Sequence, residues 1–189
     1  MAAADRLLRY IASTAAYGLT FCTHNQPATL FAYVDASYDC YTDSKSHTGV
    51  SLHLGQYSGS FLTLSKKQTI TADSTTVAEF VATHSACQKV LWAQNLLTEL
   101  GFLASIPTIM FQDNKSTIRL IVHKGSSGRT KHIAFRYNMI RECVKDHQIS
   151  IEYLPTDLMT ADTLTKPLGA QLFPIHQKRL LNLAPPLLE

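Results

Sequence analysis

Several features are scarce or absent in this sequence of 189 residues, and each absence excludes a class of protein. No apolar run reaches the roughly 18 residues of a membrane-spanning helix, and the start lacks a secretory pattern. The four cysteines form no CxxC pair, which excludes zinc-ligand spacing and disfavours a disulfide framework in a chain this long. Charged residues make up only 16%, but 46% are apolar, which is a globular composition and not a disordered one. We therefore expect an intracellular globular protein with reduced thiols and no membrane partner.

The formal net charge of +3 is mildly basic. It permits a polyanionic partner without requiring one, because Lys and Arg are scattered over most of the chain. One small cluster stands out, formed by Arg129, Lys131 and, when protonated, His132. On charge alone, a solvated loop is the simpler interpretation of this cluster.

The hydrophobic pattern predicts an alternation of strands and helices. Strands are expected at 29–37, 48–56, 60–66, 107–111 and 149–154, and helices at 3–17, 75–101, 116–123 and 132–146. A final helical region begins near Thr160 and is divided by Pro167, Gly169 and Pro174, so a short helix and a separate one near 171–182 are expected. This order fits an α/β fold in which helices cover the faces of a mixed sheet.

The long helix at 75–101 is apolar on two sides. This pattern predicts that the helix is sandwiched between a sheet and another helix. One line of side chains is Ala86, Val90, Ala93, Leu97 and Leu100, and the opposite line is Val77, Phe80, Val81, His84 and Leu91.

Four acidic residues lie where a buried carboxylate is costly unless something compensates for it. Asp35 and Asp113 each lie at the end of an apolar strand, Glu79 is on the inward face of the long helix, and Asp162 opens the last helical region. Singly, Asp113 and Asp162 could be helix caps, and Glu79 could benefit from its helix dipole. Together they indicate a divalent-cation site, because strand ends and helix starts can converge at one sheet edge. Carboxylate oxygens suit Mg²⁺ or Mn²⁺.

A set of short motifs follows the chain in a fixed order. They are Tyr33-Val-Asp-Ala-Ser37, Thr48-Gly49, Ser65-Lys-Lys-Gln68, Asp73-Ser-Thr-Thr-Val-Ala-Glu79, Asp113-Asn114-Lys-Ser116, Arg129-Thr-Lys-His-Ile133, Arg136-Tyr137, Tyr153-Leu-Pro-Thr156 and Ala161-Asp-Thr-Leu-Thr-Lys-Pro167. Together they resemble the ribonuclease H region of copia-type long-terminal-repeat retrotransposon Pol polyproteins. The resemblance covers roughly residues 29–182, in the family's order and near its spacing.

The resemblance implies a ribonuclease H-like fold, a five-stranded mixed sheet with three antiparallel and two parallel strands, flanked by helices. It also implies that Asp35, Glu79, Asp113 and Asp162 hold two Mg²⁺ ions, for which Mn²⁺ may substitute. The implied reaction is two-metal hydrolysis of the RNA strand of RNA–DNA hybrids. Like carboxylates this close repel one another, so raised pKa values are expected without metal.

Substrate recognition is expected to rest on shape and on the 2′-OH. The candidate contacts are Ser74, Thr75, Thr76, Asn114, Arg129, Lys131 and His132, the last three as phosphate contacts. Helix capping is the alternative for Ser74 or Thr75 and for Asn114, and it is compatible with either function.

The resemblance also divides the chain. Residues 1–26 resemble the end of a reverse transcriptase and a connector, 27–182 the ribonuclease H domain, and 183–189 a tail. The implied partners are an RNA–DNA hybrid and the upstream reverse transcriptase of the same polyprotein. The implied location is intracellular, in cytoplasmic virus-like particles and the nucleus.

Two departures and two rival interpretations remain. No histidine lies between Thr156 and Ala161, where many ribonucleases H carry a mobile one, so slower turnover is expected. Ala134 replaces an Asp that is usual after His132-Ile133, which touches no metal ligand. The main rival is a catalytically silent module that braces reverse transcriptase or binds nucleic acid. An integrase or resolvase is disfavoured by the order Asp, Glu, Asp, Asp.

Overall fold

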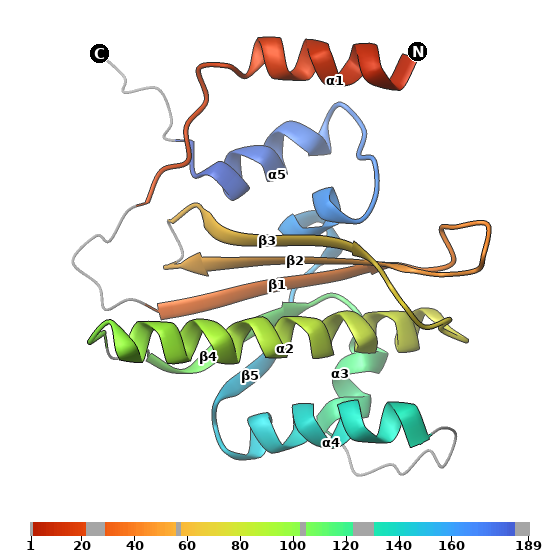
Figure 1. The fold of residues 1–189 in the computed structure, drawn as a ribbon, viewed down its shortest axis with the longest axis vertical. Coiled ribbons are helices and arrows are strands. Elements are labelled where there is room, and N and C mark those ends of the chain that lie inside the picture. The colour runs from red at the N-terminus through yellow and green to blue at the C-terminus, as the bar shows by residue number, and fades with distance from the viewer. Residues whose placement is uncertain (1, 22–28, 56–57, 103–104, 123–130, 184–189) are drawn as a thin grey trace.

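The computed structural model describes residues 2–21, 29–55, 58–102, 105–122 and 131–183 (Figure 1). Its centre is a five-stranded sheet in the order β3-β2-β1-β4-β5. The strands are β1 (Thr29–Ser37), β2 (His47–Leu54), β3 (Ser60–Lys67), β4 (Ser105–Gln112) and β5 (Ile149–Tyr153). β1, β2 and β3 pair antiparallel, whereas β4 lies parallel to both β1 and β5. The predicted mixed sheet is confirmed.

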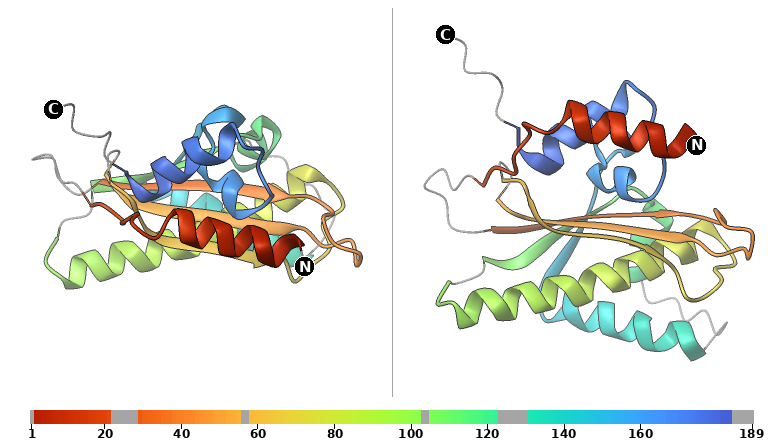
Figure 2. Two further views of the ribbon diagram at one scale, coloured as in Figure 1. Left: turned by 90° about the horizontal axis from the view of Figure 1, so that it is seen from above. Right: turned by 45° about the horizontal axis from the view of Figure 1, so that its top comes forward.

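The helices lie in layers on both faces of the sheet (Figures 1 and 2). One face is covered by α2 (Thr75–Glu99), with α3 (Lys115–Val122) and α4 (Lys131–Lys145) beside and beyond it. The other face carries two short 3₁₀ helices, η1 (Thr156–Leu158) and η2 (Thr160–Leu164), then α5 (Leu172–Leu181) and α1 (Ala2–Ser13). The sheet therefore separates a large apolar layer from a thinner one.

The core lies between the sheet and α2. Alternate residues of β1, Leu30, Ala32 and Val34, are fully buried there, and the intervening side chains of β1 point to the opposite face. The core also includes Val50, Leu52, Phe80, Ala86, Cys87, Val90, Met110, Ile121, Ile140, Cys143 and Ile149. Since these residues come from the sheet, α2, α3 and α4, the prediction that the long helix is sandwiched is confirmed.

Leu100 does not belong to this core, contrary to the pattern. Its side chain is 62% exposed, because the helix ends at Glu99 and Leu100 is its C-cap. Gly101 follows with a φ of 80°, the left-handed conformation that ends many helices, and the Phe102 N–H donates back to the Leu97 carbonyl.

Two further predicted elements differ from the observed ones. α1 ends at Ser13 and not at Tyr17; the hydroxyls of Ser13 and Thr14 both donate to the Tyr10 carbonyl, and the Tyr17 N–H bonds back to Thr14 in a tighter turn. The short helix expected near Thr160 is the 3₁₀ helix η2, so Asp162 lies within a tight 3₁₀ turn and not at the opening of an α-helix. The separate later helix is confirmed as α5.

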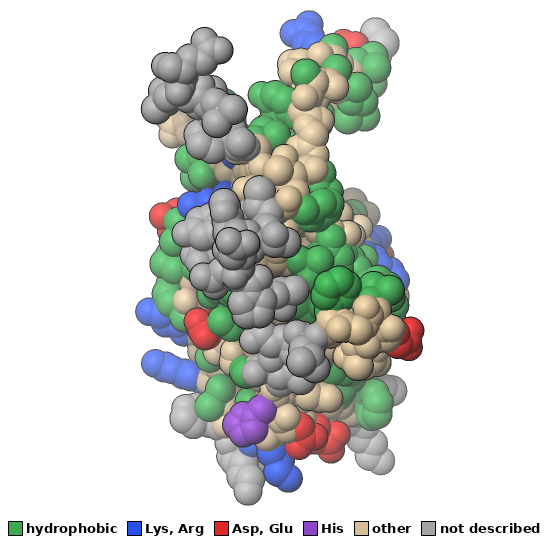
Figure 3. Space-filling view, turned by 90° about the vertical axis from the view of Figure 1, so that its left-hand side faces the viewer, with side chains coloured by type: hydrophobic (Ala, Val, Ile, Leu, Met, Phe, Trp, Pro, Cys, Tyr) green, Lys and Arg blue, Asp and Glu red, His purple; other side chains and the backbone are tan. Residues whose placement is uncertain are grey.

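α1 contacts the rest of the molecule through Tyr10. Its ring packs edge-on against Phe173 of α5, with centroids 5.6 Å apart, and its hydroxyl accepts a hydrogen bond from Gln177 at 2.8 Å. The apolar side chains of Leu7, Leu8 and Ile11 remain exposed, and α1 stands clear of the body at the top of Figure 3.

Two expectations from composition can be compared with the described residues. Cys40, Cys87 and Cys143 are all free thiols, and Cys22 lies outside the described residues. Among the helices in the described part of the chain, none combines the length and apolarity needed to cross a membrane.

Candidate functional site

Three of the four predicted acids converge at one edge of the sheet. Oxygens of Asp35, Glu79 and Asp113 all lie within 4.8 Å of one another. Parallel pairing explains the first and third: Val34 of β1 lies beside Gln112 of β4, so the next residue of each chain segment reaches the same edge. Glu79 arrives from the first turns of α2, where it is buried. The structure thus brings together three of the four predicted acids, and their role as metal ligands stays a prediction.

Asp162 lies on the other side of Asp35, outside that group of three. Its carboxyl group repels that of Asp35, and both carboxyls approach the ammonium of Lys166. Both carboxyls are buried. η2 places Asp162 there from the face of the sheet opposite α2, so the other three acids approach Asp35 from two layers of the fold.

One polar side chain that sequence reasoning missed, Gln112, holds this edge together. Its side-chain oxygen accepts hydrogen bonds from the backbone N–H groups of Asp113 and Asn114, at 2.9 and 3.1 Å. Its amide nitrogen must then face inward, where it donates to Glu79 Oε2 at 3.3 Å and to Thr83 Oγ1 at 3.2 Å. Gln112 is fully buried, so one amide links the end of β4 to α2. A glutamine at the end of an apolar strand, directly before a candidate acid, was the available signal.

Two threonine hydroxyls also donate to the acids. Thr156, just after β5, donates to Asp113 Oδ2 at 2.8 Å, and Thr165, just after η2, donates to Asp35 Oδ2. Hydrogen bonds of this kind fix the orientation of a carboxylate and favour its charged form.

The electrostatics of the site favour a bound cation. Burial, followed by repulsion from Asp162, raises the pKa of Asp35 to about 6. Burial, followed by repulsion from Asp35 and Asp113, raises the pKa of Glu79 well above its usual value. Burial also raises the pKa values of Asp113 and Asp162, as the sequence led us to expect. A dication between these oxygens would relieve their repulsion, and an all-carboxylate donor set fits Mg²⁺ or Mn²⁺.

Two of the residues for which helix capping was expected, Ser74 and Asn114, do cap helices. Ser74 caps α2 by accepting from the Val77 N–H at 3.3 Å, and Asn114 caps α3 by accepting from the N–H groups of Ser116 and Thr117. Neither Asp113 nor Asp162 caps a helix, so helix capping does not account for the positions of these two acids.

The remaining predicted substrate contacts fall into two groups. At the start of α2, near Glu79 in sequence, the side chain of Thr75 is exposed and that of Thr76 is half-buried. Lys131 and His132 lie in the first turn of α4, but their side chains and all of Arg129 are outside the described residues. Four other acids fit no position of the metal site in sequence and are exposed, as expected for turn or surface residues; they are Asp43, Asp73, Asp146 and Asp157.

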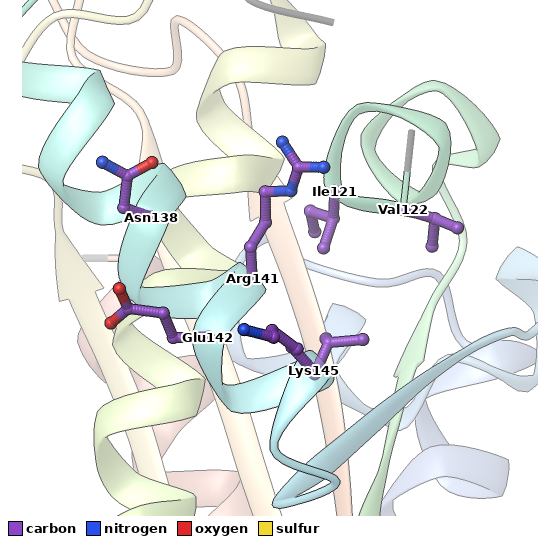
Figure 4. Close-up of a pocket in the computed structure, with 7 residues that line it drawn as sticks. Ile121, Val122, Asn138, Arg141, Glu142 and Lys145 are labelled. Carbon is purple, nitrogen blue, oxygen red and sulfur yellow. The ribbon is translucent and has the colours of Figure 1, made fainter. Parts of the chain in front are cut away.

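A pocket of about 440 Å³ lies between α3 and α4 (Figure 4). Ile121 and Val122 of α3 face Asn138, Arg141 and Lys145 of α4 across it. None of the four acids lines this pocket, so it is separate from the acidic site.

Comparison with known proteins agrees with this geometry. No protein-family profile matches the chain. Among solved structures, the chain is similar to LC11-RNase H1, isolated from compost, with a TM-score of 0.55 and 15% identity over 73% of this chain and 93% of that one. At that identity the likeness shows the fold alone. The fold is that of a ribonuclease H.

The sequence relatives are more specific. The chain is 34% identical, over 94% of its length, to the retrovirus-related Pol polyprotein from transposon RE2 of Arabidopsis thaliana. It is 35% identical, over 85% of its length, to that from transposon TNT 1-94 of Nicotiana tabacum. The chain spans 12% of the length of each polyprotein. It is a ribonuclease H-like domain of the retrovirus-related Pol family.

Proposed function

We propose that this domain hydrolyses the RNA strand of RNA–DNA hybrids with the help of two divalent cations. The observation that carries the proposal is the convergence of Asp35, Glu79 and Asp113 within 4.8 Å at a sheet edge, with Asp162 adjoining Asp35. A buried group of like charges is costly, and hydrogen-bonding side chains from three other positions hold it in place. Such an arrangement destabilises the metal-free fold, so it is better explained by a cation-dependent activity than by structural support.

The acids have distinct roles in this proposal. When bound, the two cations would activate a water nucleophile and stabilise the leaving 3′-oxygen. Asp35 belongs to the three-acid group and also repels Asp162, so it would hold both cations, and Asp113 would share that task or hold the first cation alone. Asp113 and Glu79 would complete the first position and Asp162 the second. Glu79 would also lie beside the 2′-OH of the cleaved strand, which would select RNA over DNA.

A basic cleft supports contact with a nucleic-acid backbone. This cleft, of about 280 Å³, is lined by Lys66 and Lys67 at the end of β3, by His84 of α2 and by Arg136 of α4. Lys66 and Lys67 of β3 and Arg136 of α4 bring positive side chains from two elements to one cleft, which suits phosphate groups, and such contacts make binding salt-dependent. LC11-RNase H1, which shares the fold, has also been solved in complex with an RNA/DNA hybrid. That structure matches this chain with a TM-score of 0.54.

The partners and boundaries follow from the family. We propose that residues 1–26 continue from a reverse transcriptase and that the exposed side chains of Leu7, Leu8 and Ile11 face it. The domain would act during reverse transcription, inside the cell. The alternative function is a silent module that braces the reverse transcriptase or binds nucleic acid.

The test is incubation of the purified protein with an end-labelled RNA–DNA hybrid and Mg²⁺ or Mn²⁺. Controls are EDTA and Asp113→Asn, which keeps the shape of the side chain but removes its charge. Cutting of the RNA strand alone, lost in both controls, is the expected result. Binding without cutting, with the reverse transcriptase also added, would overturn the proposal in favour of the silent module.

A further inference from the structure

One cationic side chain lies inside the acidic site. The ammonium of Lys166 is 3.0 Å from Asp162 Oδ1 and 3.8 Å from Asp35 Oδ2. Both carboxyl groups are buried, whereas the Lys166 side chain is 39% exposed. The backbone reinforces this placement, because the Lys166 N–H donates to the Asp162 carbonyl at 3.1 Å.

The two sides of Asp35 are therefore not equivalent. On one side, oxygens of Asp35, Glu79 and Asp113 form a three-acid group, and no ion pair is recorded for Glu79 or Asp113 among the described residues. On the other side, the pair Asp35 and Asp162 shares the ammonium of Lys166. An ammonium at hydrogen-bonding distance from one carboxylate and near a second occupies the place that a cation bridging the two would take.

We propose that Lys166 is a tethered counter-ion that competes with the second divalent cation for the Asp35–Asp162 side of the site. This inference rests on the proposed two-cation function. The first cation enters the three-acid group, where Lys166 lies 3.8 Å from Asp35 and forms no ion pair with Glu79 or Asp113 among the described residues. The second cation binds only when Lys166 withdraws, and the partial exposure of the Lys166 side chain gives this lysine a path into solvent.

Two consequences follow for the metal-free and loaded protein. Without metal, Lys166 offsets the repulsion between Asp35 and Asp162 and so stabilises the fold. With metal, the second position is the weaker one, so occupancy of the site is stepwise. When the second cation is bound, the freed ammonium lies at the mouth of the site, where a phosphate of the substrate would also lie.

The experiment measures Mn²⁺ binding without nucleic acid, from the electron paramagnetic resonance signal of free Mn²⁺. Wild type should bind one Mn²⁺ and, at least about tenfold more weakly, a second. Lys166→Gln should tighten the second by about tenfold and leave the first within about twofold, an estimate discounted for the exposure of the lysine. Lys166→Arg, which keeps the charge, should behave as wild type, and Asp162→Asn should lose the second ion alone.

Unchanged or weaker binding of the second Mn²⁺ by Lys166→Gln would overturn the proposal and leave Lys166 as a support for Asp162. A measurement on the wild type covers the case in which the variant does not fold. The lysines are labelled by reductive ¹³C-methylation, and the Lys166 signal is identified by its absence in Lys166→Arg. That signal should move during binding of the second Mg²⁺ and not of the first; movement with the first, or none, contradicts the proposal. Failure of hybrid cutting with stepwise Mn²⁺ binding intact would count against the proposed function only.

Discussion

Gly49 of β2 lies directly opposite Asp35 of β1 in the antiparallel pair, and η2 packs against its bare backbone. A Cβ atom at Gly49 would lie 2.6 Å from Thr165 Cγ2 and 2.8 Å from the Ala161 carbonyl oxygen. The absence of a side chain here is what lets η2 approach the sheet closely enough for Asp162, Thr165 and Lys166 to reach Asp35. The Thr48-Gly49 motif thus has a physical role in the site.

Gly49→Ala should therefore damage the second half of the site more than the first. The added methyl group contacts backbone, which cannot move aside cheaply, so η2 must shift. We expect loss of the weaker Mn²⁺ ion, a fall of at least about tenfold in hybrid cleavage, and a destabilisation of about 1–3 kcal/mol. Gly169→Ala is the matched control, because a Cβ there meets nothing within 4 Å. Wild-type Mn²⁺ stoichiometry in Gly49→Ala would contradict this account.

Glu79→Gln should abolish cleavage and yet stabilise the metal-free protein. The substitution removes one of several buried like charges and retains an oxygen that can accept from Gln112. In EDTA we expect the melting temperature to rise by a few degrees. The further rise that we expect on adding Mg²⁺ to the wild type should be smaller in this variant. Differential scanning fluorimetry with and without Mg²⁺ measures both; a lower melting temperature in EDTA would count against the repulsion argument.

The raised carboxyl pKa values set the direction of the pH dependence. The pKa of Asp35 is raised to about 6 from 3.8, so between these values the folded protein binds more protons than the unfolded chain. The free energy of unfolding should therefore fall as pH rises from about 4 through 6, and the raised pKa of Glu79 contributes a trend of the same sign. Thermal melts in EDTA from pH 4.5 to 8 test it, with Asp35→Asn as the control that should show a shallower slope.

Cleavage should show the opposite trend, since cations bind deprotonated carboxylates. We expect activity in Mg²⁺ to rise through the same range in which the metal-free fold loses stability. The linkage would be refuted if stability in EDTA and cleavage in Mg²⁺ changed with pH in the same direction.

Gln112→Leu should impair catalysis without preventing hybrid binding. It removes the donor to Glu79 and the acceptor for the two N–H groups that follow β4. Loss of such supporting hydrogen bonds commonly lowers metal affinity or activity by about 10–100-fold. We expect kcat to fall by that amount with KM for the hybrid within about threefold. Gln94→Leu, at a buried glutamine that bonds Thr108 away from the acids, controls for general destabilisation.

Ser74 separates capping from substrate contact. Ser74→Ala should cost about 1 kcal/mol of stability through the lost cap of α2. Ser74→Asp keeps a capping oxygen but adds a negative charge. If Ser74 is only a cap, Ser74→Asp should retain wild-type stability and hybrid KM. If Ser74 also lies at the nucleic acid, the added charge should raise KM several-fold at low salt and less at high salt.

Much of the fold and site was predictable because the signals are local. Alternating apolar residues give the strands, and an acid that ends such a strand, as Asp35 and Asp113 do, is conspicuous. The roles of Gln112 and Lys166 could not be predicted from the sequence, because they depend on contacts between elements distant in the chain. The amide of Gln112 matters only because α2 presents Glu79 to it, and Lys166 reaches Asp35 only because Gly49 admits η2. Leu100 was wrongly assigned to the core because its spacing continues the apolar line of the helix, although the helix ends before it, at Glu99.

The four acids come from β1, α2, the end of β4 and η2, so no fragment that lacks any of these elements contains the whole site. Cation affinity is then a property of the assembled tertiary structure and is absent from the unfolded chain. By mass action, each bound ion adds to the free energy of unfolding in proportion to the logarithm of its concentration. Under the proposed function, a fall in free Mg²⁺ in a cell would both slow cleavage and loosen the fold, so the supply of one ion would set the lifetime of the protein as well as its rate.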